Sequence, residues 1–412
     1  MSLDIWMFMG KISAFEQEGT DRILDRLQET GIQTLVLGDL IFNKAPAYPA
    51  SPEHYTACET QPPEMPQENA PRYEILRKAV EGAKDRGLNI YLHDWGQGAR
   101  SCINDPEKRR YGQARTLDVI EQFPGIDGFI LDGPEWGYEI APGHRSDLFK
   151  CDCDCCRAQA QAWNYDFQAL LEARDRFKHR LNALNNLPPG RRERGLIDGL
   201  DTLIADPDLF HWFRFKTDSI EHLVSGFAEA THQMDPPRQI ACGPRLPAFA
   251  PFTGYNFQRL SNIVDFQCPK LYFWQHGIDG LKGTLYRYAE TLCDWNPGLS
   301  ETDALDRFRE LFALWIPGVS KLADLDAPLP PEFFSEVAAS EIAKMRERIT
   351  DVGHIRPWVG LHHGGVRMDS GELEHLIETV RTGGLISYIH WHYSDMSESD
   401  WTTVEAAIKQ NA

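Results

Sequence analysis

The chain has 412 residues, of which 42% are hydrophobic and 25% are charged, as in an ordinary globular protein that can bury a sizeable core. It contains 42 lysines and arginines against 61 aspartates and glutamates. The formal net charge of -19 repels phosphate backbones and anionic lipid surfaces, which disfavours nucleic-acid and membrane partners. A homo-oligomer is compatible with this composition.

The amino-terminal residues run almost directly into a strand-like segment, without a basic and apolar leader. No apolar run is close to the roughly 18 to 20 residues that a membrane-spanning helix needs. We therefore expect a cytoplasmic protein. In a reducing compartment, the group of Cys151, Cys153, Cys155 and Cys156 favours metal binding over disulfide formation.

Short apolar runs alternate along the chain with longer amphipathic segments, which is typical of repeated βα units. The predicted strands are residues 5–9, 34–42, 88–93, 128–132, 239–242, 266–273, 356–362 and 385–392. The predicted helices are residues 20–30, 73–86, 115–122, 218–233, 257–263, 334–350, 371–382 and 400–409. Eight such units predict an α/β fold in which residues 1–412 form a single (β/α)8 TIM barrel.

Two long helical insertions follow predicted strands four and six. The first, residues 150–210, carries the cysteine group, and the second, residues 281–331, contains Trp295 and Trp315. Loops that follow the strands of such a barrel lie on its C-terminal face, where the active site is built. We therefore expect both insertions to border the functional site.

The segment that ends strand four carries the clearest chemical signal. An apolar strand, residues 128–132, ends at Asp132, and a short turn then brings Glu135 and Trp136. Glycoside cleavage needs one carboxyl group to protonate the leaving oxygen and a second to act as nucleophile or base. The alternative is that Asp132 caps the loop and Glu135 is solvent-exposed.

The cysteines form a second signal. Cys151, Cys153 and Cys156, with Cys102 from the loop after strand three, would complete a tetrahedral thiolate site for structural zinc. The alternative is a set of ordinary free cysteines.

The order of a strand-four acidic motif followed by Cys-x-Cys-x-x-Cys, with an earlier cysteine after strand three, resembles the zinc-containing bacterial β-galactosidases of glycoside hydrolase clan A. The segments at residues 254–260 and 264–272 also resemble glycosidase barrels. The resemblance covers less than half of the chain. It implies that Glu135 is the acid/base and that Cys102, Cys151, Cys153 and Cys156 bind zinc.

The sequence departs from the clan pattern at two places. The clan acid follows an asparagine, whereas here Pro134 precedes Glu135, and strand seven ends in Leu361, His362 and His363 without a nucleophilic glutamate. We therefore expect Asp132, Asp94 or Asp395 to serve as the second carboxylate or as a substrate anchor.

Two other functions stay open from the sequence. Histidines and carboxylates at the strand ends could bind a catalytic metal, as in a metal-dependent sugar isomerase or lyase, although no His-x-His motif follows strand one. A non-catalytic carbohydrate-binding barrel is the third alternative. No Walker or Rossmann glycine loop is present, so we expect no nucleotide cofactor.

Aromatic and charged residues near the predicted strand ends are candidates for binding a carbohydrate substrate. Tryptophan faces can stack on sugar rings, and Arg245 and Lys270, if they converge, can bind a carboxylate or sulfate on the sugar. The candidates are Trp6, Asp39, His93, Trp95, Trp136, Arg245, Lys270, Trp274, His362, His390 and His392.

Overall fold

A computed structural model describes residues 3–38, 40–42, 45–95, 102–140, 147–183, 196–276 and 279–409. Its main sheet has the strand order β8-β7-β6-β5-β2-β1-β13-β11-β9, and all of its pairings are parallel. The strands are β1 (Asp4–Met9), β2 (Thr34–Leu37), β5 (Asn89–Trp95), β6 (Gly128–Asp132), β7 (Gln239–Gly243), β8 (Phe266–Gln267), β9 (Lys270–Leu271), β11 (Trp358–Gly360) and β13 (Ser387–Trp391).

The two end strands of this order are halves of one barrel strand. β8 pairs with β7 and β9 pairs with β11, and only Cys268 and Pro269 separate them. The backbone N–H of Cys268 donates to Cys242 on one side, and Pro269 accepts from Trp358 on the other. The sheet therefore closes, and the predicted TIM barrel is confirmed. The sixth strand was expected to be continuous, but it is interrupted at Pro269, which has no N–H for the ladder.

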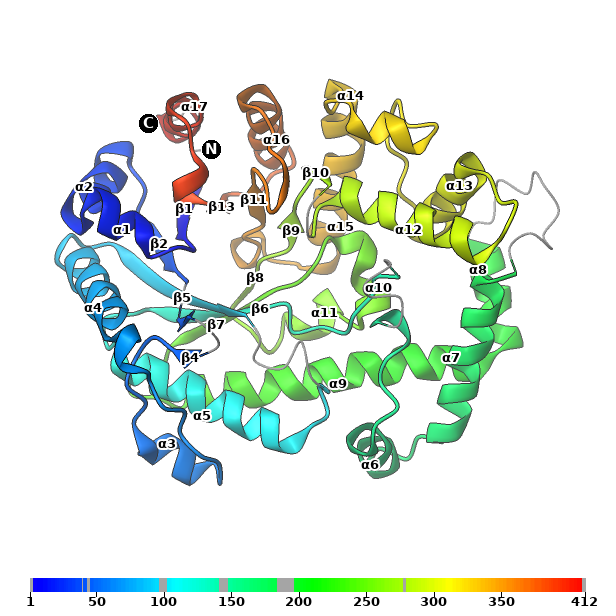
Figure 1. The fold of residues 1–412 in the computed structure, drawn as a ribbon, viewed down its shortest axis with the longest axis horizontal. Helices are drawn as coiled ribbons and strands as arrows, with labels where there is room; N and C mark the ends of the chain where they lie inside the picture. Colours follow the sequence, from blue (N-terminus) through cyan, green and yellow to red (C-terminus); the bar gives the residue numbers. More distant parts are fainter. Residues whose placement is uncertain are drawn as a thin grey trace.

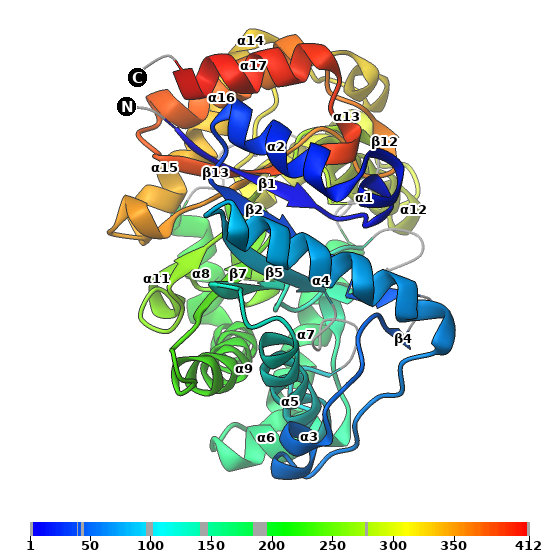
Figure 2. The same ribbon diagram turned by 90° about the vertical axis from the view of Figure 1, so that its left-hand side faces the viewer.

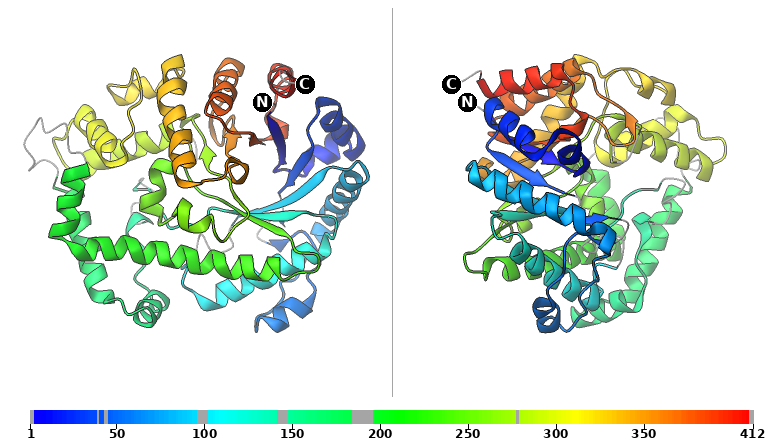
Figure 3. Two further views of the ribbon diagram at one scale, coloured as in Figure 1. Left: turned by 180° about the vertical axis from the view of Figure 1, so that it is seen from behind. Right: turned by 60° about the vertical axis from the view of Figure 1, so that its left-hand side comes forward.

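The helices form a layer around the strands, as Figure 1 and the rear view in Figure 3 show. The helices that follow the strands are α1 (Ser13–Glu18), α2 (Thr20–Thr30), α4 (Ala70–Asp85), α5 (Pro106–Gln122), α9 (Pro207–His232), α10 (Ala250–Thr253), α11 (Phe257–Leu260), α15 (Ala339–Arg348), α16 (Ser370–Thr382) and α17 (Glu398–Lys409). A π-helical turn, Phe334–Ala338, precedes α15. Helix α17 contacts β1, so the last helix covers the first strand. In Figure 2, α17 lies above α2, and Arg26 of α2 forms an ion pair with Glu398 of α17.

Further helices, one short hairpin and one antiparallel pair of strands distant in the chain occupy the connections that follow the strands. They are the hairpin of β3 (Ile41–Phe42) with β4 (Ala45–Pro46), the pair of β10 (Gln275–His276) with β12 (Gly365–Val366), and the helices α3 (Pro52–Ala57), α6 (Asp154–Ala162), α7 (Phe167–Leu181), α8 (Leu196–Ala205), α12 (Leu281–Trp295), α13 (Glu301–Phe312) and α14 (Pro331–Phe333). The helices after β6 meet those after β9, because Asn296 Nδ2 donates to the carbonyl of Leu181 at 2.9 Å.

Predicted and observed boundaries differ mainly at strand two. It was expected to reach Phe42, but β2 ends at Leu37 and the chain then turns into the β3–β4 hairpin. The turn begins at Gly38, where a Cβ would lie 3.1 Å from the Phe8 ring and 3.3 Å from the Gly10 backbone. No helix in the described part of the chain is long and apolar enough to cross a bilayer.

Candidate active site at the carboxyl ends of the strands

Strand β6 brings Asp132 to the mouth of the barrel, where its side chain is 17% exposed. Lys270 Nζ forms an ion pair with Asp132 Oδ1 at 2.8 Å, and His93 Nε2 lies 3.9 Å from Oδ2. Burial by itself raises the pKa of Asp132, but Lys270 and His93 outweigh it and hold this pKa well below its usual range. Asp132 is therefore ionised at neutral pH.

Glu135 follows in a turn that starts at Gly133, whose φ of +58° is readily adopted by glycine. The Glu135 carboxyl group accepts hydrogen bonds from the backbone N–H of Arg245 at 3.2 and 3.3 Å, and Arg245 Nε lies 3.1 Å from Oε1. Burial raises the pKa of Glu135 to about 7, although Arg245 and Lys270 oppose this shift. Glu135 therefore exchanges a proton near neutral pH.

Asp279 joins the two cations of this site. Its Oδ2 pairs with Arg245 Nη1 and lies 3.4 Å from Lys270 Nζ, so Arg245 and Lys270 converge as the sequence suggested. Sequence reasoning missed Asp279, because it lies in the connection after strand six and not at a predicted strand end. The Asp279-Gly280 pair is a turn signal that could have drawn attention to it.

Aromatic rings form a floor beneath these charged groups. Phe8 stacks on Trp391 with ring centroids 4.5 Å apart, and Trp358 lies edge-on to both rings at 5.2 and 5.5 Å. His93 packs against Phe8 at 4.9 Å. These residues come from β1, β5, β11 and β13, so their interior-facing side chains fill the barrel as a layer.

Several buried polar atoms near this floor have no hydrogen-bonding partner in the described parts of the chain. They are Trp358 Nε1, Trp391 Nε1, Tyr272 Oη and His392 Nδ1. A Cβ placed on Gly243 would lie 3.1 Å from Trp358 Nε1 and 3.4 Å from Asp132 Oδ1, so that indole and that carboxylate flank the same point. Because buried polar groups are normally hydrogen-bonded, these atoms leave hydrogen-bonding capacity unused at the base of the site.

Two of the tryptophans expected at the rim, Trp6 and Trp136, lie elsewhere. Trp6 is only the third residue of β1, so it lies near the amino end of the strand, where its Nε1 donates to Asp4. Trp136 is buried and donates from Nε1 to the carbonyl of Lys216 at 3.1 Å. Trp274 is also buried and stacks on Tyr272 at 4.3 Å. These positions correct the rim placement of Trp6 and Trp136, whereas Trp274 lies beside Tyr272 and Gly280 at the carboxyl ends of the strands.

The acid Asp94 is directed away from the mouth. Side chains alternate along a strand, and the adjacent His93 faces the barrel interior, so Asp94 faces the helices. There it pairs with Arg115 of α5, and both side chains are almost completely buried. The structure therefore does not bring Asp94 to Asp132 and Glu135, which corrects the position expected for it.

The C-terminal histidines divide between the barrel and the helix layer. His390 is fully buried and, by alternation with Trp391, faces the helices. This corrects its expected place at the mouth. His392 lies against Phe8 at 5.0 Å, and His362 Nε2 is 3.7 Å from Asp395 Oδ2 at the rim.

Two predicted substrate-binding residues cannot be placed in the same way. Asp39 lies outside the described residues, and only the backbone of Trp95 is described, at the end of β5.

The four predicted zinc ligands converge. The Sγ atoms of Cys102, Cys151, Cys153 and Cys156 all lie within 4.8 Å of one another, and Cys102 and Cys156 are 3.3 Å apart. Four thiolates around one Zn²⁺, with Zn–S bonds of about 2.3 Å, are separated by similar distances. Asn104 Nδ2 also contacts Cys156 Sγ at 3.5 Å. The donor set therefore fits a closed tetrahedral zinc site.

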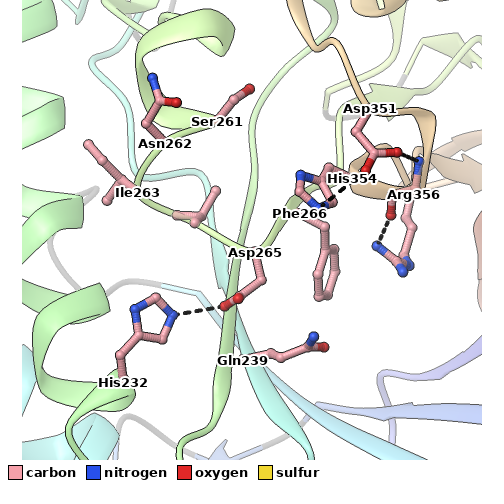
Figure 4. Close-up of a pocket in the computed structure, with 12 residues that line it drawn as sticks. His232, Gln239, Ser261, Asn262, Ile263, Asp265, Phe266, Asp351, His354 and Arg356 are labelled. Carbon is pink, nitrogen blue, oxygen red and sulfur yellow. Dashed lines mark hydrogen bonds and ion pairs between the residues drawn. The ribbon is translucent and has the colours of Figure 1, made fainter.

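A separate cavity of about 490 Å³ lies at the amino ends of β7 and β8, shown in Figure 4. His232 Nε2 is 2.9 Å from Asp265 Oδ2, which also accepts from the backbone N–H of Ile240. Arg356 is engaged with the ring of Phe266, with its guanidinium 4.4 Å from the ring centroid. In TIM barrels this face serves stability, whereas the carboxyl-end face carries the chemistry.

The fold and the buried charges at the strand ends define a TIM-barrel protein with an enzyme-like site. No family model and no curated protein matches the chain. Solved structures do match, including the PgaB (BpsB) glycoside hydrolase domain from Bordetella bronchiseptica, with a TM-score of 0.56, 10% identity and complete coverage of both chains. A β-galactosidase from the psychrophilic Marinomonas ef1 has a TM-score of 0.54 and 9% identity, over 99% of this chain and 59% of that one. At these identities the likeness shows the TIM-barrel fold alone.

Proposed function

We propose that this protein is a glycoside hydrolase in which Glu135 is the general acid/base. The observation that carries the proposal is the contrast between two neighbouring carboxyl groups. Asp132 is held ionised, whereas the pKa of Glu135 is raised to about 7 by burial. Environments that separate the pKa values of two carboxyl groups in this way are typical of acid/base pairs in glycosidases.

In the proposed reaction, protonated Glu135 donates its proton to the glycosidic oxygen as the bond to the anomeric carbon breaks. Ionised Asp132, the second carboxylate, stabilises the positive charge that develops on the sugar ring. Water then adds to the anomeric carbon and gives up a proton to Glu135, which restores its acid form. Arg245 keeps Glu135 oriented through its backbone N–H and its guanidinium. Lys270 holds Asp132 through its ammonium group, which lies 2.8 Å from Oδ1.

The aromatic floor would bind the sugar. Trp391, which is 9% exposed and stacks on Phe8 with one face, would give apolar contact to sugar C–H groups, and its Nε1 would donate a hydrogen bond to a hydroxyl group. The Tyr272 hydroxyl group adds a further donor or acceptor. Within the described residues, the one group with metal-ligand spacing is the cysteine cluster, and it does not include the histidines and carboxylates that a metal-dependent isomerase would use.

The test is hydrolysis of a panel of aryl α- and β-glycosides, including glucuronides, by the wild type and by Glu135→Gln. We expect cleavage of one anomer by the wild type and a loss of about 10²- to 10⁴-fold in kcat for the variant. Glu139→Gln is the matched control, because Glu139 lies in the same loop but pairs with Arg287. Equal activity in the wild type and Glu135→Gln would overturn the acid/base role. Absence of turnover on every substrate would favour a carbohydrate-binding barrel.

We also propose that Cys102, Cys151, Cys153 and Cys156 bind one structural zinc ion. Four protein ligands leave no open position for catalysis, so the metal would join the loop after β5 to the segment after β6. Cys156→Ser should lose the zinc found in wild-type protein by elemental analysis and should melt at a lower temperature. Cys155→Ser, which changes the adjacent residue outside this set, should keep both. Full zinc content in Cys156→Ser would contradict the assignment.

A further inference from the structure

The charged groups of the site are arranged as an alternating chain. Glu135 contacts Arg245, Arg245 contacts Asp279, Asp279 contacts Lys270, and Lys270 contacts Asp132. A single oxygen, Asp279 Oδ2, lies between the two cations. An anionic group of a substrate would have to occupy this position in order to bind Arg245 and Lys270 together.

Asp279 is fixed in this position by its surroundings. Its φ of +62° is uncommon for a residue other than glycine, although Asp is among those that adopt it most readily. The next residue, Gly280, packs so tightly on the Trp274 indole that a Cβ would lie 2.5 Å from Trp274 Nε1. The backbone N–H of Leu281 then donates to the carbonyl of Tyr272 at 2.8 Å. The carboxylate is therefore held between the cations and is not a mobile counterion.

The charges of the five ion-paired side chains at this site balance when Glu135 is protonated. Burial raises the pKa of Asp279, but Arg245 and Lys270 outweigh it, and the resulting pKa lies below its usual value, so Asp279 is ionised. Two cations then face two permanent carboxylates, and Glu135 adds a negative charge only when it loses its proton. Burial lowers the pKa of the neighbouring His363, and that of His392 to about 3, so neither adds positive charge at neutral pH.

We propose that Asp279 is a specificity-determining residue: it occupies the anion position between Arg245 and Lys270, so that the site accepts an uncharged sugar and rejects uronic or sulfated sugars. This inference rests on the proposed glycosidase function for its kinetic consequence only. The binding consequence follows from the charges themselves. It replaces the expectation from the sequence that Arg245 and Lys270 bind an acidic sugar, because Asp279 takes the place of the acidic group.

The kinetic test compares matched aryl glycosides and aryl uronides at pH 7. Wild type should prefer the uncharged sugar by about tenfold or more in kcat/KM, the size of one charged hydrogen bond. Asp279→Asn should reduce or invert this preference, because the neutral amide no longer balances the charges of Arg245 and Lys270, which then attract an anionic group. A preference that is unchanged in Asp279→Asn, or a wild type that favours uronides, would overturn the proposal.

The binding test needs no turnover and therefore separates this inference from the glycosidase proposal. Calorimetric titration with sodium glucuronate and with glucose should show that the wild type binds glucuronate no more tightly than glucose. Asp279→Asn should bind glucuronate about tenfold or more tightly than the wild type does. Asp279→Asn/Lys270→Gln, which removes one cation, should lose the gain. If Asp279→Asn does not fold, tight glucuronate binding by the wild type that Lys270→Gln abolishes would still refute the proposal.

Discussion

The ion pair between Asp94 and Arg115 offers a direct test of how the strand residues divide between structure and chemistry. Both side chains are almost completely buried between β5 and α5. Asp94→Asn would leave the Arg115 guanidinium buried without its partner carboxylate, and arginine does not deprotonate in proteins. Removing one member of a buried pair costs about 3 to 5 kcal/mol.

The expected loss can be expressed as a melting temperature. With an unfolding entropy of about 2.1 cal/mol/K per residue, a chain of this length that unfolds as one unit should melt about 4 to 6 °C lower. Asp94→Leu/Arg115→Met should lose less than Asp94→Asn, because no buried charge is then left unpaired. Calorimetry or circular dichroism at pH 7 measures both variants.

Activity decides between the two roles of Asp94. A structural role predicts that Asp94→Asn, assayed at 25 °C while folded, keeps kcat close to that of the wild type on any substrate that the wild type cleaves. An unchanged melting temperature together with a kcat reduced by about 100-fold or more would refute this reasoning, because that result is expected of a carboxylate that acts on the substrate.

Two further predictions concern stability. Burial lowers the pKa of His390 to about 4. As the pH is lowered from about 6.5 to 4, the unfolded chain therefore binds a proton that the folded chain does not, and the free energy of unfolding should fall by about 3 kcal/mol. His390→Phe should flatten this part of a urea-unfolding profile, and an unchanged slope would contradict the assignment. Gly254→Ala should cost more stability than Gly298→Ala in the same assay. Both positions have positive φ, but a Cβ at Gly254 would lie 2.8 Å from the Lys216 backbone, whereas Gly298 has open space. Equal losses would contradict this packing.

The parts of the fold that local pattern determines could be predicted from the sequence. The apolar run that ends at Asp132 gave the bounds of β6, and the amphipathic run from Thr20 to Thr30 gave those of α2. The convergence of Cys102 with the later cysteines also follows from sequence order, since adjacent strands of a barrel place their following loops side by side.

The parts that depend on facing direction could not be predicted in the same way. Strands of a parallel barrel are buried on both faces, so the sequence of β5 does not say whether His93 or Asp94 faces the interior. Only one of these two adjacent residues can face the interior, and the ion pair of Asp94 with Arg115 shows that it is His93. Asp279 depends on the tertiary position of a connection rather than on a strand, so no periodicity points to it.

The most direct test of the central claim is the dependence of Glu135→Gln on the leaving group. The substrates are aryl glycosides of the sugar that the wild type cleaves, from dinitrophenyl to unsubstituted phenyl. If Glu135 donates the proton, the loss in kcat/KM should be small for dinitrophenolate, which departs unprotonated, and should reach about 10²- to 10⁴-fold for phenyl. The same loss across the whole series would contradict the assignment of Glu135 as the general acid.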